Sequence, residues 1–351
     1  QKQVSLCYKK LNMSKKNSSV LNLNKILLSN QNLLDQYLLF KRNFKKFNKN
    51  RKFLVAVSGG PDSLALAAFC KAFSNENDIK FFFILVDHGI RKNSKTESLK
   101  VKKLLKKHKI NLTILKNKVK IIKNIQSNAR KARYNLMSIY CKRNGISKIL
   151  TAHHSNDQIE TFLIRLARGS GVQGLSSMKT VSKLESNIYI IRPLLDFKKS
   201  QLEKLSKRVF GKYFTDPSNQ NLKFLRVKVR KLITSLERSG IHQNQIIKSI
   251  KNLRSSGDIL NKYIKKNYDL NVTKKGKYFV INLLNLFKEP EEIQYKVISN
   301  VIQKCSKSYY PPRAEKVTYL INQVKLNKRT KFTLGKCVLE VKKGTLKISK
   351  E

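Results

Sequence analysis

Residues 53–63 read Phe-Leu-Val-Ala-Val-Ser-Gly-Gly-Pro-Asp-Ser, an apolar run followed by a turn of glycines and hydroxyl groups. The β-branched, apolar run is typical of a buried parallel strand. Two consecutive glycines allow successive backbone N–H groups to converge on an anion, and the apolar series from Leu64 begins a helix whose N-terminus favours negative charge. The stretch therefore predicts a phosphate-binding turn between a strand and a helix.

Two better-known phosphate motifs do not explain this turn. No Gly-x-x-x-x-Gly-Lys-Ser/Thr pattern occurs near it. The pattern Gly-x-Gly-x-x-Gly is present at 169–174, but it follows a predicted helix and not a strand. We interpret residues 169–174 as a helix end and a loop.

Alternating strands and helices are predicted through about residue 195 of the chain. Such alternation indicates an α/β fold with a doubly wound parallel sheet, which binds ligands at the carboxyl ends of its strands. Polar motifs follow three of the predicted strands, at 58–63, 87–88 and 153–154. The strands are expected at 53–57, 81–86, 111–115, 148–152 and 188–192, and the helices near 62–73, 95–108, 127–144 and 156–168.

The length of 351 residues and a hydrophobic content of 40% are enough for two cores, so two domains are expected. We predict a basic N-terminal extension at 1–50, a nucleotide-binding α/β domain at 51–220 and a smaller, mostly helical domain at 221–351. Amphipathic helices are expected over 236–305, and a short hairpin with turns at Gly335 and Gly344 is expected near the end.

The charge balance indicates a polyanionic partner. Lys and Arg number 75 against 21 Asp and Glu, a formal net charge of +54, as expected of a protein that follows an RNA backbone. Lysines are spread along the whole chain, so we attribute about half of the excess to a lysine-rich composition. Charge alone therefore gives weak support for RNA binding.

Cysteine spacing and hydropathy argue against several classes of protein. The five cysteines form no Cys-x-x-Cys, which argues against a disulfide framework, a zinc site or an iron–sulfur cluster, and Cys70 and Cys141 are expected in the core. No apolar run approaches the roughly 18 residues of a membrane span. The N-terminus does not resemble a secretory signal, so a cytoplasmic protein is expected. Two alternatives stay open: a location in an organellar stroma, and a translation start at Met13.

The motifs, in this order, resemble one family. The Ser-Gly-Gly-x-Asp-Ser turn resembles the signature of the N-type ATP pyrophosphatases, or PP-loop enzymes. Together with the segments that follow it, the turn is similar to the tRNA(Ile)-lysidine synthetase family, closely over about 50–235 and loosely beyond. These segments are Val86-Asp-His-Gly-Ile-Arg91, Ile125-Gln-Ser-Asn-Ala-Arg-Lys-Ala-Arg-Tyr134, Thr151-Ala-His-His-Ser-Asn-Asp-Gln-Ile-Glu-Thr161 and Gly174-Leu-Ser-Ser-Met178.

The resemblance implies a two-step ligation with ATP and Mg²⁺. The wobble cytidine of an isoleucine tRNA with a CAU anticodon is adenylated, and free L-lysine then displaces AMP to form lysidine, with pyrophosphate as the other product. Residues 221–351 are expected to bind tRNA. Longer relatives have one more C-terminal domain, so this sequence is expected to be a short form. The lysine pocket and the oligomeric state stay open, a homodimer being one option.

The resemblance also assigns site residues. Asp62, Asp157 and Glu160 are expected to be catalytic, and Asp62 to help place Mg²⁺. Arg130, Arg133 and Arg226 are expected to bind tRNA, although Leu222-Lys223 replace the usual Arg-Asn pair before Arg226. The residues expected to bind ATP are Ser58, Gly59, Gly60, Pro61, Asp62, Ser63, His88 and His154.

The predicted helix after the fourth strand carries two of these acids. Ser155 and Gln158 fit a capping box, which would place Asp157 and Glu160 in the first turn, where acids complement the helix dipole in any protein. The resemblance favours a catalytic or nucleotide-positioning role for them. Asn156 stands where many members have a second acid, which puts a metal ligand at 156 in doubt.

Two other functions remain open from the sequence. A PP-loop enzyme that thiolates a tRNA base shares the phosphate turn, but generally needs a reactive cysteine pair or cluster ligands. A non-catalytic RNA-binding module with a degenerate nucleotide fold would also be basic. The sequence keeps the complete Ser-Gly-Gly-x-Asp-Ser turn and the complete Asp-Gln-x-Glu-Thr segment, which argues against a degenerate nucleotide site.

Overall fold

The computed structural model describes residues 23–47, 51–90, 93–117, 119, 125–185, 187–215, 224–308, 311–326 and 330–351. The chain divides into two compact units, and the division lies between Ile250 and Lys251, within helix α11 (Gln243–Asn271). This division differs from the expected boundary at 220. Arg91 and the Leu-Lys pair at 222–223 lie outside the described residues.

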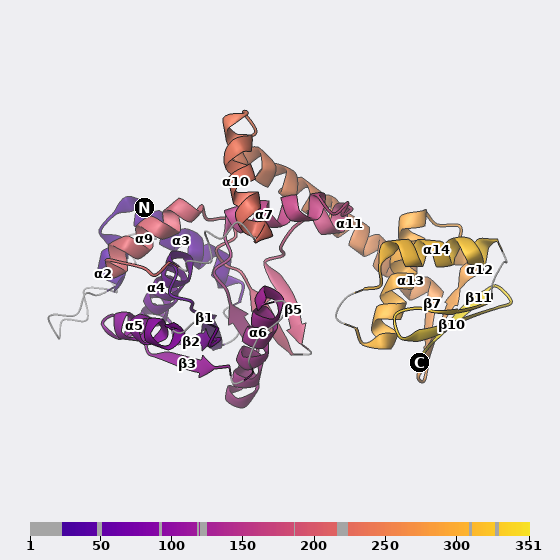
Figure 1. The fold of residues 1–351 in the computed structure, drawn as a ribbon, viewed down its shortest axis with the longest axis horizontal. Coiled ribbons are helices and arrows are strands. Elements are labelled where there is room, and N and C mark those ends of the chain that lie inside the picture. Colours follow the sequence, from indigo (N-terminus) through magenta and orange to yellow (C-terminus); the bar gives the residue numbers. More distant parts are fainter. Residues whose placement is uncertain are drawn as a thin grey trace. The chain divides into compact units, whose positions relative to one another are not determined.

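A six-stranded sheet forms the centre of the first unit (Figure 1). Its order is β3-β2-β1-β4-β6-β5, in which β5 alone runs antiparallel to its neighbour. The strands are β1 (Lys52–Ala56), β2 (Lys80–Asp87), β3 (Leu112–Lys116), β4 (Lys148–Leu150), β5 (Val181–Glu185) and β6 (Ile188–Ile191). The expected doubly wound α/β fold is therefore confirmed, and its topological switch point lies between β1 and β4.

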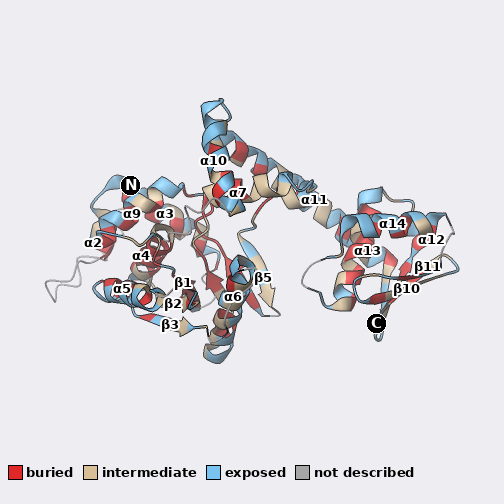
Figure 2. Cartoon of the chain, in the orientation of Figure 1, coloured by how far each residue is buried: buried red, intermediate tan, exposed pale blue. Residues whose placement is uncertain are grey.

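Helices cover both faces of this sheet because its central strand is apolar on both sides. Phe53 and Val55 of β1 face one core, and Leu54 faces the other. The first core is closed by helices α4 (Pro61–Glu76), α5 (Ser94–Lys106) and α9 (Lys199–Phe210). The second core is closed by α6 (Ile125–Asn144), as the buried residues in Figure 2 indicate.

Residues 23–47 belong to the first core. They were expected as part of a basic extension, but they form helices α2 (Leu23–Leu28) and α3 (Gln31–Lys45), which bury an aromatic face. The ring of Phe40 lies 5.1 Å from that of Phe69 on α4, and the ring of Phe44 lies 4.9 Å from that of Phe53 on β1. The basic side chains of α3, Lys41, Arg42 and Lys45, gather near its C-terminal end, while its buried face is mainly apolar.

Helix α10 (Leu225–Arg238) and the start of α11 also pack into the first unit. Val229 and Ile233 of α10 and Ile246 and Ile250 of α11 form a small core with Ile159 of α7 (Ser155–Leu166). These contacts explain why the division falls at 250 and not at 220.

The second unit packs helices against a five-stranded antiparallel sheet of order β7-β8-β11-β10-β9. The strands around Gly335 and Gly344 confirm the expected hairpin turns. The stretch at 272–282, expected as helix, is instead a hairpin turning at Gly276, because its alternating residues suit a half-buried strand. The elements are β7 (Val272–Lys275), β8 (Tyr278–Asn282), α12 (Leu283–Leu286), α13 (Glu291–Ser306), α14 (Ala314–Lys325), β9 (Lys331–Thr333), β10 (Cys337–Lys342) and β11 (Thr345–Lys350).

Across the described residues, we find no helix with the length and apolarity to traverse a bilayer.

Candidate active site

The turn after β1 is held closed by one hydroxyl. Ser63 Oγ accepts the backbone N–H groups of Ser58 and Gly59, at 3.1 and 3.2 Å, and donates to the carbonyl of Gly60 at 3.0 Å. Gly59 has φ of +87°, and a Cβ there would lie 2.5 Å from Val101 Cγ2, so only glycine fits. Pro61 is the first residue of α4, where its missing N–H costs no hydrogen bond.

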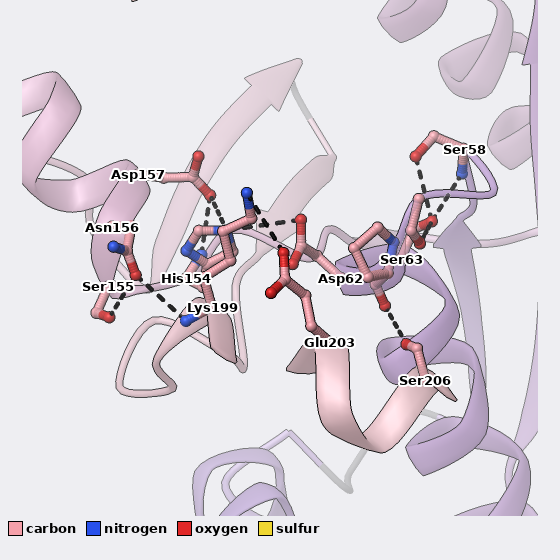
Figure 3. Close-up of polar contacts among 12 residues, drawn as sticks. Ser58, Asp62, Ser63, His154, Ser155, Asn156, Asp157, Lys199, Glu203 and Ser206 are labelled. Atoms are coloured by element: carbon pink, nitrogen blue, oxygen red, sulfur yellow. Dashed lines mark hydrogen bonds and ion pairs between the residues drawn. The ribbon is translucent and has the colours of Figure 1, made fainter. Parts of the chain in front are cut away.

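Helix α9 and the segment after it support this turn from the other side. Ser206 Oγ donates to the carbonyl of Pro61, and the N–H of Phe214 donates to the carbonyl of Gly59 at 3.0 Å. Figure 3 shows Ser206 beneath the start of α4. Sequence reasoning did not identify these supports, because no local pattern marks them.

A histidine and two carboxylates meet between the ends of β1 and β4 (Figure 3). His154 Nε2 lies 3.6 Å from Asp62 Oδ2 and 3.6 Å from Asp157 Oδ2. Burial by itself lowers the pKa of His154, but Asp62, Asp157 and Glu160 outweigh it, so the pKa is raised above its ordinary value. The switch point thus brings the phosphate turn and the acidic helix together.

The N-terminus of α7 is capped one residue earlier than expected. The N-cap residue is His154, and its backbone N–H donates to Asp157 Oδ2 at 3.0 Å. Gln158 is not a capping side chain. Its side-chain amide donates to the carbonyl of Met178 at 3.1 Å and accepts the N–H of Met178 at 2.8 Å. These two bonds hold the loop that contains helix α8 (Val172–Leu175).

Glu160 is buried, with 2% of its surface exposed, and is paired with Arg230 of α10. Arg230 Nε lies 2.5 Å from Glu160 Oε1, and a second guanidinium nitrogen lies 3.5 Å from Oε2. Burial lowers the pKa of Arg230, but Glu160, Asp157 and Asp62 reverse that effect and raise it. Sequence reasoning missed Arg230, although its position one helical turn after Arg226 could have indicated a shared face.

His88 stands at the end of β2, in contact with an expected tRNA ligand. Arg133 Nε donates to His88 Nε2 at 3.4 Å. Burial, then Arg133, lowers the pKa of His88 to about 4, against the opposing effect of Asp87. His88 is therefore neutral near pH 7, and its buried Nδ1 has no hydrogen-bond partner.

The other two predicted tRNA ligands lie close to His153. Burial lowers the pKa of His153 to about 3; Asp157 opposes this, whereas Arg192, Arg130 and Arg226 add to it. Arg130 also lies over the ring of Tyr134, 4.9 Å from its centroid. Arg130 and Arg226 therefore contribute positive charge around His153, which precedes the acidic turn of α7.

Asn156 joins neighbouring helices. Its Oδ1 accepts the N–H of Lys199 at 3.2 Å, at the start of α9, and its Nδ2 donates to Gln243 of α11 at 2.8 Å. An aspartate here could accept from Lys199 but could not donate to Gln243.

The residues at the phosphate turn suit a magnesium ion bound with a nucleotide. Mg²⁺ is commonly held by one or two carboxylates together with substrate phosphates and water. Asp62 Oδ1 is buried without a hydrogen-bond partner, which leaves it available to a ligand. Within the described ranges, no group of three or more His, Cys, Asp or Glu side chains could hold a metal by itself. A single carboxylate beside bound phosphates therefore fits.

The fold and this site define a nucleotide-binding α/β protein whose phosphate turn lies at the switch point of a doubly wound sheet. The PP-loop domain family matches residues 35–237. The tRNA(Ile)-lysidine synthase of Wolbachia pipientis wMel is 35% identical over 280 residues, which are 78% of this chain and 64% of that protein. The tRNA(Ile)-lysidine synthase of Orientia tsutsugamushi is 32% identical over 308 residues, 85% of this chain and 69% of that protein.

The chain therefore belongs to the tRNA(Ile)-lysidine synthase family of PP-loop proteins, as its motifs indicated. It spans 64% of the length of the Wolbachia relative. Among solved structures, the U34-tRNA thiolase NcsA from Methanococcus maripaludis matches with a TM-score of 0.54 at 18% identity, covering 63% of this chain and 79% of that one. That likeness concerns the fold alone.

Proposed function

We propose that this chain ligates lysine to the wobble cytidine of an isoleucine tRNA with a CAU anticodon, using ATP and Mg²⁺ and releasing AMP and pyrophosphate. One observation carries the proposal. The phosphate turn and the acidic helix, 95 residues apart at Asp62 and Asp157, converge on His154 at the switch point of a PP-loop fold. The family membership supplies the substrates.

In the first step, the cytidine O2 attacks the α-phosphate of ATP, and pyrophosphate leaves. The N-terminus of α4 would hold the leaving pyrophosphate, since the N–H groups of Ser58 and Gly59 already donate to Ser63 Oγ. Asp62 would hold Mg²⁺, which when bound neutralises negative charge on the phosphates. His154 lies beside Asp62, and Asp62, Asp157 and Glu160 raise its pKa.

In the second step, the lysine ε-amine attacks C2 of the adenylated cytidine, a C–N bond forms, and the original O2 leaves within AMP. The amino acid carries a cationic α-ammonium group, and buried carboxylates are the groups that hold such a cation. Glu160 is buried, Asp157 is half-buried, and the two lie nearly one turn apart on α7, which supports them in this role.

Sulfur transfer is a weaker alternative for this chain. All four cysteines in the described part, Cys70, Cys141, Cys305 and Cys337, are buried. Burial raises the pKa of Cys70, and burial together with Glu185 raises the pKa of Cys141 to about 12, so neither thiol forms a ready nucleophile.

The decisive experiment is lysine transfer to RNA. Purified protein is incubated with ATP, Mg²⁺ and labelled lysine at physiological salt, with CAU-anticodon isoleucine tRNA or with initiator or elongator methionine tRNA. We expect label in the isoleucine tRNA alone, because an inserted anticodon base and contacts elsewhere on the tRNA give discrimination that net charge cannot. Equal labelling of all three would refute the identity of the substrate. Labelling of none would favour a non-catalytic RNA-binding module.

We propose that Arg130, Arg133 and Arg226 contact tRNA. Removing the charge of Arg226 tests its own contact. We expect Arg226→Gln to raise the KM for tRNA and to flatten the salt dependence of binding, by about 0.7–0.9 in the slope of log K against log salt, because one phosphate contact is lost. Filter binding over a salt series measures this slope. The matched control is Arg238→Gln, exposed on the same helix. An identical slope in both variants would assign Arg226 to the solvated surface.

A further inference from the structure

Two carbonyl groups of the phosphate turn are held by donors from outside the turn. The carbonyl of Gly59 accepts the N–H of Phe214 at 3.0 Å, and the carbonyl of Pro61 accepts Ser206 Oγ (Figure 3). Both donors belong to helix α9 or to the segment directly after it. Because Ser206 follows Pro61 by 145 residues, a distant part of the chain supports the turn.

Each of these two bonds fixes the direction of a backbone N–H group. A trans peptide unit is planar, and its C=O points opposite to the N–H that follows it. The bond to the Gly59 carbonyl therefore fixes the N–H of Gly60, and the bond to the Pro61 carbonyl fixes the N–H of Asp62. Pro61 itself has no N–H. Both N–H groups lie at the N-terminus of α4, where helical N–H groups have no partner within the helix and can bind an anion.

Ser206 supplies a hydroxyl on an otherwise apolar stripe of α9. Leu202, Leu205 and Val209 on this stripe are buried in the first core, and Ser206 among them is 0% exposed. A buried hydroxyl costs free energy unless it makes a hydrogen bond, whereas alanine would fit the stripe without that cost. The bond to Pro61 satisfies the hydroxyl, so its role is directed to the phosphate turn.

The other end of α9 is held at the start of α7. Asn156 Oδ1 accepts the N–H of Lys199 at 3.2 Å, and the N–H of Ser155 donates to the carbonyl of Phe197 at 2.9 Å. Helix α9 thus contacts the first turn of α7, which carries Asp157, as well as the phosphate turn. It gives the two halves of the candidate active site a common support.

We propose that Ser206 is a positioning residue for adenylation, which holds the Pro61 carbonyl so that the N–H of Asp62 points at the leaving pyrophosphate. This inference rests on the proposed function for its reaction. An N–H group that is oriented in advance needs no reorganisation when charge develops on the leaving group. The backbone of Phe214 orients the N–H of Gly60 in the same way. Ser206 is the member of the pair whose donor is removed by shortening a side chain.

The test removes this hydroxyl in the full chain. Ser206→Ala is measured for binding of magnesium pyrophosphate by calorimetry, and for single-turnover release of pyrophosphate from ATP in the presence of tRNA. We expect the Kd for pyrophosphate to rise by about fivefold or more and the release rate to fall by about tenfold, because the N–H of Asp62 is no longer held toward the anion. The KM for lysine should stay within about twofold of the wild type, since the lost bond belongs to the phosphate turn.

Two comparisons exclude a merely structural effect. Ser74→Ala removes a hydroxyl that donates to the carbonyl of Lys71 at 2.8 Å, near the other end of α4, and we expect it to leave pyrophosphate binding unchanged. The melting temperature of Ser206→Ala should stay within about 4 °C of the wild type. Unchanged pyrophosphate binding in Ser206→Ala, an equal loss in Ser74→Ala, or an equal loss of lysine affinity would overturn the inference.

The failure of this inference is distinguishable from the failure of the proposed function, because pyrophosphate binding is measured without turnover. If both proteins bind pyrophosphate equally and the wild type transfers lysine normally, only the role of Ser206 is refuted. If the wild type binds pyrophosphate more tightly than Ser206→Ala but transfers no lysine to any of the three tRNAs, the proposed reaction is refuted and the role of Ser206 in the phosphate turn is supported.

Discussion

Asp62→Asn is expected to slow the adenylation step by about 10²-fold or more while leaving tRNA affinity nearly intact. The substitution keeps the size of the side chain but removes the charge that faces His154 at 3.6 Å. It also removes the carboxylate oxygen, buried and without a hydrogen-bond partner, that suits Mg²⁺. Single-turnover release of pyrophosphate measures the step, and filter binding measures the tRNA affinity.

The matched control for this variant is Asp78→Asn. Asp78 pairs with Arg51 on the surface, and its side chain is 88% exposed, so the same chemical change should leave turnover unaltered. Wild-type adenylation by Asp62→Asn would remove Asp62 from the mechanism. Release of ADP and phosphate by the wild-type protein, in place of AMP and pyrophosphate, would exclude cleavage between the α and β phosphates.

Phe40→Ala is expected to destabilise the first unit by about 3–5 kcal/mol, as for a fully buried phenylalanine. The Phe40 side chain is 0% exposed and contacts four other rings, with centroids 5.1 Å away at Phe69, 5.5 Å at Phe44, 6.3 Å at Phe73 and 6.5 Å at Tyr37. Its removal leaves a cavity between α3 and α4. Calorimetry of the full chain measures the effect, since the two units can unfold in separate transitions.

Leu38→Ala on the same helix provides the comparison for Phe40. Leu38 is 42% exposed, so its truncation should change stability by only about 0.5 kcal/mol. If both variants unfold alike, residues 23–47 are a dispensable extension and not a part of the core. A larger loss in Phe40→Ala means that the nucleotide-binding unit begins before residue 51.

The phosphate turn was predictable because its information is contiguous. A strand, two glycines, a proline at the first helical position and an acid follow one another within 11 residues, and each has a backbone preference that acts locally. The alternation of apolar runs and helical stripes likewise predicted the parallel sheet and the meeting of Asp62 with His154 at its switch point. By contrast, the half-exposed edge strand β5 was missed because its residues alternate only weakly, and the hairpin β7-β8 was missed because residues 236–305 were interpreted as amphipathic helices.

The sequence by itself determined the fold class, the phosphate turn and the family of this protein, since all three depend on short, ordered motifs. Tertiary structure alone decided that residues 23–47 complete the first core, that α10 belongs to the same unit as α7, and that Glu160 is paired with Arg230. Those contacts join positions far apart in the chain, 70 residues in the case of the ion pair. Their partners are selected by which apolar faces meet, and that depends on the packing of whole helices, which no local pattern records.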